Sequence, residues 1–292
     1  MKTLSTAFVG LLFSTASLAD NLSNGVVALK ENRFEKAATF FQSSCDEKNM
    51  TGCANLGMLY KEGKGVERNH AKAQELFKKV CDAGLGDGCV NFAEMCNKEE
   101  KPSVGCEPKI AMLEKACNSK QRYAKGCYIL SFFYQEGQGV KRDHGKAAEL
   151  NQRACDADLG VACVNLGFAY QHGRGVTQNH PYALNSYQKA CNLGVARGCN
   201  NLGDLYKDGK GAAQNFAKAV ELFNAACHSK QEPDHHSCYS LGKLYFKGEG
   251  VEKNTQNALK LFDRACKLGN KNGCESLKSS GTNWTYHAFM AR

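Results

Sequence analysis

The chain has 292 residues, and its 38 lysines and arginines against 29 aspartates and glutamates give a net charge of +9. Charges of both signs are interspersed, and no arginine-rich run contains interleaved aromatic residues, which argues against a nucleic-acid partner. Sixteen cysteines are a high and even number, which in an exported chain indicates a disulfide framework. No Cys-x-x-Cys occurs, which weakens zinc-finger and thioredoxin-type interpretations.

Residues 1–19 have the pattern of a secretory signal peptide. Lys2 supplies a positive start, residues 7–13 ("AFVGLLF") form a short apolar core, and Ala19 precedes a predicted cleavage site at Asp20. This apolar run is too short to span a bilayer, and no later run reaches the roughly 18 residues that a transmembrane helix needs. We therefore expect a soluble mature chain that is secreted or periplasmic. A retained N-terminal anchor is the alternative.

The spacing of the cysteines indicates a repeat of about 36 residues. Apart from Cys96 and Cys106, successive cysteines alternate between a long interval of 28 and a short interval of 8, which grows to 10 and 11 in two places. A period of this size is typical of solenoids built from stacked supersecondary units.

Each repeat is predicted to contain two helices. The first follows a cysteine, as in "CANLGMLY", where Leu56 and Tyr60 are four residues apart and share one helical face. The second ends at the next cysteine, as in "AKAQELFKKVC", where Ala73 and Phe77 belong to one apolar stripe. We expect Ala73 and its counterparts to face Gly57 and its counterparts, so that the two helices pack closely.

A Gly-x-Gly segment separates the two helices of most repeats. The stretch "YKEGKGVERN" (60–69) returns as "YQEGQGVKRD", "YQHGRGVTQN", "YKDGKGAAQN" and "YFKGEGVEKN". A phosphate-binding glycine loop normally connects a strand to a helix, whereas helical patterns flank this one. We predict a hinge in which the first glycine ends a helix with a positive φ. The residues predicted to begin the next helix are Asn69, Asp143, Asn179, Asn215 and Asn254.

The resulting fold class is all-α, with residues 20–279 forming one solenoid of about seven repeats. The predicted repeats are 22–49, 50–85, 86–121, 124–159, 160–195, 196–231 and 235–270, followed by a capping helix at 271–279. Residues 280–292 form a tail with Trp284, Tyr286 and Phe289. We expect the tail to pack on the last helix, and partner docking is its functional alternative.

The cysteines are predicted to pair locally. Two cysteines eight apart on one helix would lie about 12 Å apart along its axis, whereas a disulfide needs Cα atoms within about 7 Å, so the chain must turn between them. Pairing across the long intervals is geometrically feasible but leaves Cys45 and Cys274 alone at opposite ends. Local pairing predicts Cys45–Cys53, Cys81–Cys89, Cys117–Cys127, Cys155–Cys163, Cys191–Cys199, Cys227–Cys238 and Cys266–Cys274, with Cys96–Cys106 as the remaining pair.

From about residue 22 to 278 the chain resembles Sel1-like repeat proteins, which are relatives of tetratricopeptide repeats. The resemblance is carried by segments such as "NLGMLYKEGKGVERNHAKAQELFKKVC" and "NLGDLYKDGKGAAQNFAKAVELFNAAC". The Cys-x7-Cys spacing narrows it to the disulfide-rich Helicobacter cysteine-rich proteins. The repeat at 86–121 departs from the pattern by lacking the hinge, and residues 22–45 have a shorter turn. The resemblance implies an exported right-handed superhelix with a concave binding surface.

A binding scaffold is the first functional hypothesis. Five residues after the first cysteine of each repeat the side chain varies, whereas an asparagine recurs three positions earlier in four repeats. In related tetratricopeptide folds such asparagines can hold a peptide backbone; alternatively, they only bond the neighbouring helix. The predicted binding residues for a protein or peptide are Asn55, Met58, Asn91, Phe132, Asn165, Phe168, Asn201, Asp204 and Lys243. We expect a monomer without a cofactor.

Catalysis is the second hypothesis, since some members of the resembled group are described as penicillin-binding proteins with β-lactamase activity. In the predicted mature chain, Ser-x-x-Lys occurs at Ser240–Lys243, without the Ser-Asp-Asn and Lys-Thr-Gly partners that serine β-lactamases use. We interpret it as a coincidence within the repeat, and leave the catalytic residues unassigned.

Histidines do not predict a metal site. One group shares a repeat position, where its members should lie too far apart to bind one ion: His70, His144 and His180. Another lies in the insertion "HSKQEPDHHSC", which we interpret as a solvated loop: His228, His235 and His236. A third hypothesis is a role in redox chemistry or in assembly of the cell envelope. Without Cys-x-x-Cys, however, the chain resembles a substrate of disulfide-forming enzymes more than a catalyst of disulfide formation.

Overall fold

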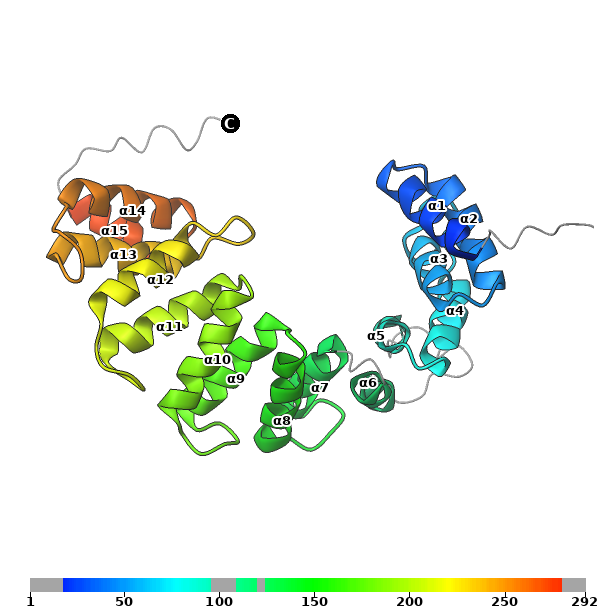
Figure 1. The fold of residues 1–292 in the computed structure, drawn as a ribbon, viewed down its shortest axis with the longest axis horizontal. Helices are drawn as coiled ribbons and strands as arrows, with labels where there is room; N and C mark the ends of the chain where they lie inside the picture. The colour runs from blue at the N-terminus through cyan, green and yellow to red at the C-terminus, as the bar shows by residue number, and fades with distance from the viewer. Residues whose placement is uncertain (1–17, 96–108, 120–123, 280–292) are drawn as a thin grey trace, which may run out of the picture. The chain divides into compact units, whose positions relative to one another are not determined.

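The computed structural model describes residues 18–95, 109–119 and 124–279, and every regular element in these ranges is an α-helix (Figure 1). The helices are α1 (Leu18–Lys30), α2 (Phe34–Asp46), α3 (Met50–Glu62), α4 (His70–Asp82), α5 (Gly86–Met95), α6 (Lys109–Asn118), α7 (Ala124–Glu136), α8 (His144–Asp156), α9 (Gly160–His172), α10 (His180–Asn192), α11 (Ala196–Asp208), α12 (Phe216–Cys227), α13 (His235–Lys247), α14 (Thr255–Lys267) and α15 (Lys271–Ser279).

The chain divides into two compact units, residues 1–126 and 127–292. In the first unit each helix from α1 to α6 packs on the next, around a core that includes Phe41 and Leu56. In the second unit the same sequential packing runs from α8 to α15, and α9 also contacts α11. Packing between neighbours along the chain is the arrangement of a solenoid, so the predicted fold class is confirmed.

The hinge after α9 shows why Gly-x-Gly recurs between helices. Gly173 has a φ of 67° and ends α9, where its N–H donates to the carbonyl of Ala169. The side chain of Asn179 then accepts a hydrogen bond from the N–H of Tyr182 at 3.1 Å and begins α10. The same type of cap is made by Asn69, Asp143, Asn215 and Asn254. The predicted hinge is therefore confirmed, since helices flank it on both sides.

The second hinge glycine serves contact between repeats. Gly175 has a φ of 72°, and a Cβ atom at this position would overlap the backbone carbonyl of His144, the first residue of α8. The hinge of one repeat thus lies directly against the start of the second helix in the preceding repeat. A side chain on this residue would push the two repeats apart.

A glycine inside most of the first helices makes room for a ring on the second helix. A Cβ atom on Gly203 of α11 would lie 2.8 Å from the ring of Phe223 on α12. Gly57 faces Phe77 in the same way. The predicted approach of the alanine to the glycine is seen at the equivalent pair in α13 and α14, where the Ala258 carbonyl would lie 3.3 Å from a Cβ atom on Gly242, but the aromatic ring is the nearer neighbour. The absent side chain creates space for a large aromatic group, and Ala73 is buried separately.

Disulfides join the second helix of one repeat to the first helix of the next. Six predicted pairs are present, with Cα atoms 4.5–4.7 Å apart: Cys45–Cys53, Cys81–Cys89, Cys155–Cys163, Cys191–Cys199, Cys227–Cys238 and Cys266–Cys274. Cys117 and Cys127 are also disulfide-bonded. The predicted Cys96–Cys106 pair lies outside the described residues.

Removing one bridge should cost a measurable share of the stability. The variant Cys191→Ala/Cys199→Ala opens a loop of about nine residues, and we expect the free energy of unfolding to fall by about 2.5 kcal/mol. Urea denaturation followed by circular dichroism measures the change. The variant Cys155→Ala/Cys163→Ala has the same spacing and should lose a similar amount. An unchanged midpoint for both variants would show that the bridges do not stabilise the repeats.

Two predicted terminal features fall outside the described residues. These are most of the signal peptide and the aromatic tail with Trp284, Tyr286 and Phe289. Within the described ranges, no helix combines the length and the apolar character that crossing a membrane requires.

Candidate functional site

A pocket of about 490 Å³ lies in the second unit, where α8 meets α7 and α9. We call it the α8 pocket. It brings together three of the predicted binding residues, Phe132 from α7 and Asn165 and Phe168 from α9. The other residues that line it are Tyr128, Ile129, Gln135, His144, Ala147, Ala148, Asn151, Ala169 and Arg174.

The α8 pocket exists because α8 carries smaller side chains than the corresponding helices. Five second helices place a buried aromatic ring four residues after a buried alanine: Phe41, Phe77, Tyr187, Phe223 and Phe262. In α8 this position holds Asn151. At Ala148 the other second helices of this unit have Leu184, Val220 and Leu259. Since Asn151 and Ala148 both line the pocket, the volume lost from these two side chains opens into it.

A polar pair replaces the usual glycine and ring at the base of the pocket. Ser131 takes the glycine position of α7, and its Oγ lies 3.1 Å from Asn151 Oδ1 and 2.6 Å from the Tyr128 carbonyl. The Asn151 amide donates to the Ala147 carbonyl at 3.0 Å. Ser131 and Asn151 are 2% and 3% exposed, and buried polar atoms are tolerated when they are hydrogen-bonded in this way.

The mouth of the α8 pocket is aromatic and positively charged. Phe132 and Phe168 are 50% and 40% exposed, which is unusual for such large apolar side chains. Arg174 places its guanidinium carbon 5.2 Å from the centroid of the Phe168 ring, in cation–π geometry. The lining contains Arg174 and His144 but no carboxylate. The mouth therefore suits an apolar group that carries negative charge nearby.

Asn165 offers a free amide inside the α8 pocket. Its side chain is half-buried and makes no hydrogen bond to any residue in the described ranges. An amide group both donates and accepts hydrogen bonds. Asn165 can therefore meet a peptide unit without first breaking an internal bond.

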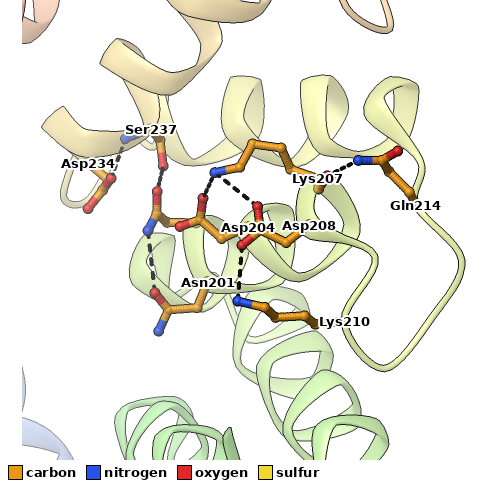
Figure 2. Close-up of polar contacts among 9 residues, drawn as sticks. Asn201, Asp204, Lys207, Asp208, Lys210, Gln214, Asp234 and Ser237 are labelled. Atoms are coloured by element: carbon orange, nitrogen blue, oxygen red, sulfur yellow. Dashed lines mark hydrogen bonds and ion pairs between the residues drawn. The ribbon is translucent and has the colours of Figure 1, made fainter.

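Asn201, by contrast, belongs to an internal network between α11 and α13 (Figure 2). Ser237 Oγ donates to Asn200 Oδ1 at 2.8 Å, and the Asn200 amide donates to Asn201 Oδ1 at 3.3 Å. The backbone N–H of Ser237 donates to Asp234 Oδ1 at 2.6 Å, which begins α13. Asn201 thus accepts a hydrogen bond from Asn200 on its own helix, whereas the alternative predicted a bond to the neighbouring helix.

Tyr187 lies beside this network and is fully buried. Its hydroxyl donates to Gln171 Oε1 at 2.8 Å. Burial raises the pKa of Tyr187 above its ordinary value; the Asn201 side chain acts in the opposite direction and the charge of Asp204 adds to the rise. The ring stays neutral at physiological pH and serves the packing of α9 on α10.

Asp204 is committed to an ion-pair cluster on α11 (Figure 2). Lys207 Nζ lies 2.5 Å from Asp204 Oδ1 and 3.7 Å from Asp208, and Lys210 Nζ lies 3.4 Å from Asp208. Burial lowers the pKa of Lys207, but its hydrogen bond to Asp204 and the charges of Asp204 and Asp208 outweigh this and raise the pKa. Lys207 therefore remains charged, and the two signs offset each other on this surface.

The remaining predicted binding residues lie apart from the α8 pocket. Lys243 is exposed on α13, with its Nζ 5.7 Å from the centroid of the Tyr239 ring. In the first unit, Asn55 and Met58 lie half-buried on α3 and Asn91 lies half-buried on α5. The predicted set is thus divided among several surfaces rather than gathered in one site.

Sequence reasoning missed the other residues of the α8 pocket, among them His144 as a lining residue, Asn151 and Arg174. The signal for Asn151 was present in the chain, since it breaks an aromatic position that five other second helices keep. Arg174 lies within the hinge "YQHGRGVTQN". Because of its glycines, this segment was interpreted only as a turn between two helices and not as part of a binding site.

The model of the Sel1 repeat family matches residues 51–85, 124–159, 160–195, 196–230 and 235–270, which is more than half of the chain. The chain belongs to the Sel1 repeat family. The helix pair and glycine hinge described above are thus Sel1 repeats, and the α8 pocket lies where the repeats at 124–159 and 160–195 meet.

Individual relatives cover parts of this Sel1 repeat protein. HcpC of Helicobacter pylori (strain J99 / ATCC 700824), named as a candidate β-lactamase, is 46% identical over 48 residues, 16% of this chain and 17% of HcpC. Cytochrome c oxidase assembly factor 7 of Xenopus tropicalis is 30% identical over 123 residues, 40% of this chain and 52% of that protein. The chain thus spans a sixth to about half of these relatives. The resemblance to the Helicobacter cysteine-rich proteins is confirmed.

A solved structure supports the same fold. A protective antigen of uropathogenic Escherichia coli with an SLR fold superposes with a TM-score of 0.76 at 24% identity, covering 89% of this chain and 55% of the antigen. At this identity the likeness concerns the fold alone.

The residues weighed for catalysis are dispersed in this Sel1 repeat protein. Within the described ranges, no hydrogen bond joins Ser240 to Lys243, and no group of three histidine, cysteine, aspartate or glutamate side chains is arranged to hold a metal ion. The rings of His235 and His236 lie 4.1 Å apart, whereas His228 Nδ1 lies 3.1 Å from the Asn224 carbonyl. A serine nucleophile needs a hydrogen-bonded base, and Ser240 has none in the described ranges.

Proposed function

We propose that this Sel1 repeat protein is an exported scaffold that binds a protein or peptide on the concave face formed by its first helices. The α8 pocket carries the proposal. It combines the exposed rings of Phe132 and Phe168 with the free amide of Asn165, and large pockets with a few polar groups are the usual places for ligands.

The disulfides support export, with residues 1–19 removed as a signal peptide. Disulfide-rich chains persist in oxidising compartments such as the periplasm or the extracellular space. We propose a periplasmic or secreted monomer. The name of the Xenopus relative concerns assembly of another protein, which accords with a scaffold and not with a catalyst.

Photo-crosslinking tests the proposed binding face. The photoreactive residue p-benzoylphenylalanine is placed at Phe168 in one variant and at Asn185, exposed on α10, in a matched control. We expect discrete crosslinked proteins from cell-envelope extract at Phe168 and none of them at Asn185. Identical products at both positions, or no product at Phe168, would contradict the proposal.

Hydrolysis of β-lactams is the second candidate, and its support is the name of HcpC over a short match. A nitrocefin assay of the oxidised protein tests it directly. The scaffold proposal expects no turnover above buffer. Turnover that disappears in Ser240→Ala would instead assign catalysis to that serine.

A further inference from the structure

We propose that the α8 pocket receives an aromatic side chain of an extended peptide segment whose neighbouring residues are acidic. This inference rests on the proposed function, because it assumes a peptide ligand, and it adds which peptide the site selects. It is argued from the volume of the pocket, the groups at its wall and the charges at its mouth.

The shape of the ligand group follows from the other repeats. Tyr187 and Phe223 fill the space between their own helices with a ring, and both are fully buried. At the corresponding place α8 has Asn151, and Ala148 beside it is also small. The space thus opened is lined by Tyr128, Phe132 and Phe168, and aromatic rings pack favourably against one another. A ligand ring would replace the one that this repeat lacks.

The polar groups favour a peptide that continues past the ring. Asn151 is already hydrogen-bonded within the chain, to Ser131 and to the Ala147 carbonyl. Asn165 has no hydrogen-bond partner in the described ranges and lines the same pocket. A main-chain peptide unit, which offers one donor and one acceptor, complements this amide.

The charges select acidic neighbours for the ring. Arg174 lies over Phe168 and forms no ion pair with a described residue, and His144 is the other basic side chain of the lining. Lys141 and Arg142 precede α8 and line an adjoining pocket with His144. The one acid of that lining, Asp143, uses its carboxylate to cap α8. A carboxylate beside the ring would therefore meet cations, and a lysine would be repelled.

The first experiment compares three blocked peptides on the intact oxidised protein by titration calorimetry. They are acetyl-Asp-Phe-Asp-amide, acetyl-Asp-Ala-Asp-amide and acetyl-Lys-Phe-Lys-amide. We expect the first to bind at least about tenfold more tightly than either of the others, a factor that corresponds to about 1.4 kcal/mol. Equal affinities, or no saturable binding of the first peptide, would overturn the inference.

The second experiment fills the pocket by giving α7 and α8 the glycine and the aromatic ring that most other repeats of this chain have. The variant Ser131→Gly/Asn151→Phe restores the glycine and the ring together, because a Cβ atom opposite such a ring would lie only 2.8 Å away, as at Gly203. We expect affinity for acetyl-Asp-Phe-Asp-amide to fall at least tenfold while the melting temperature is kept. Unchanged affinity in this folded variant contradicts the inference.

Further variants separate charge from shape. Arg174→Gln should weaken binding of the acidic peptide several-fold, whereas Asn185→Ala on α10 should leave it unchanged. If the protein with p-benzoylphenylalanine at Phe168 and an unfilled α8 pocket gives its discrete crosslinks but acetyl-Asp-Phe-Asp-amide does not bind, the scaffold function stands and the aromatic-acidic specificity fails. If these crosslinks are also absent, both proposals fail.

Discussion

Replacing Gly175 with alanine is expected to lower the free energy of unfolding by about 3 kcal/mol or more. Two costs combine. A φ of 72° costs a residue with a side chain about 1–2 kcal/mol, and the new Cβ would collide with the backbone of His144, which adds about 1–3 kcal/mol of overpacking. Backbone atoms cannot rotate away, so the repeats at 124–159 and 160–195 must separate locally. Urea denaturation and amide exchange of α8 measure the effect.

Gly194 is the matched control for this prediction. It also has a positive φ, 82°, but nothing lies within 4 Å of a Cβ atom built there. Gly194→Ala should therefore pay only the conformational cost of about 1–2 kcal/mol. Equal losses at Gly175 and Gly194 would mean that the contact between hinge and preceding repeat contributes nothing.

Phe223→Ala is the other change with a large expected effect, a loss of about 3–5 kcal/mol. The ring is fully buried and lies against Gly203. Because glycine has no side chain, no group at this position can move to fill the cavity that the substitution leaves. The free energy of unfolding from denaturant titration provides the measurement. Phe246→Ala, at a ring that is 48% exposed on α13, should cost less than about 1 kcal/mol. A small loss at both positions would refute the glycine-ring packing.

The period of the cysteines explains why so much of the fold could be predicted. A disulfide across an interval of eight residues requires a turn, and this requirement, together with the cysteine count, placed Cys155 and Cys163 at the same end of two different helices. The capping role of Asn179 could likewise be predicted from the sequence, because a helix cap depends on residues that are only three positions apart. Such features are local, and local geometry can be worked out from spacing.

The candidate site was only partly predictable, because it depends on contacts between helices. Spacing put Phe132 and Phe168 at equivalent positions, but not the cavity beside them, which results from the small side chains of α8. Spacing related Gly57 to Ala73, but did not show that the ring of Phe77 one turn further along is the nearest neighbour of this glycine. Asn201 looked identical to Asn165 in the repeat pattern. Its role differs because Asn200 and Ser237 come from different repeats and meet only in the folded chain.

The short separation of the bridged cysteines bears on how the protein matures. Each described bridge closes a stretch of only 8 to 11 residues, so its partners meet as soon as one helical hairpin corner forms. Oxidation can then advance from the N-terminus as synthesis proceeds, without waiting for distant segments. A chain built this way offers few opportunities for mispaired thiols and little work for an isomerase.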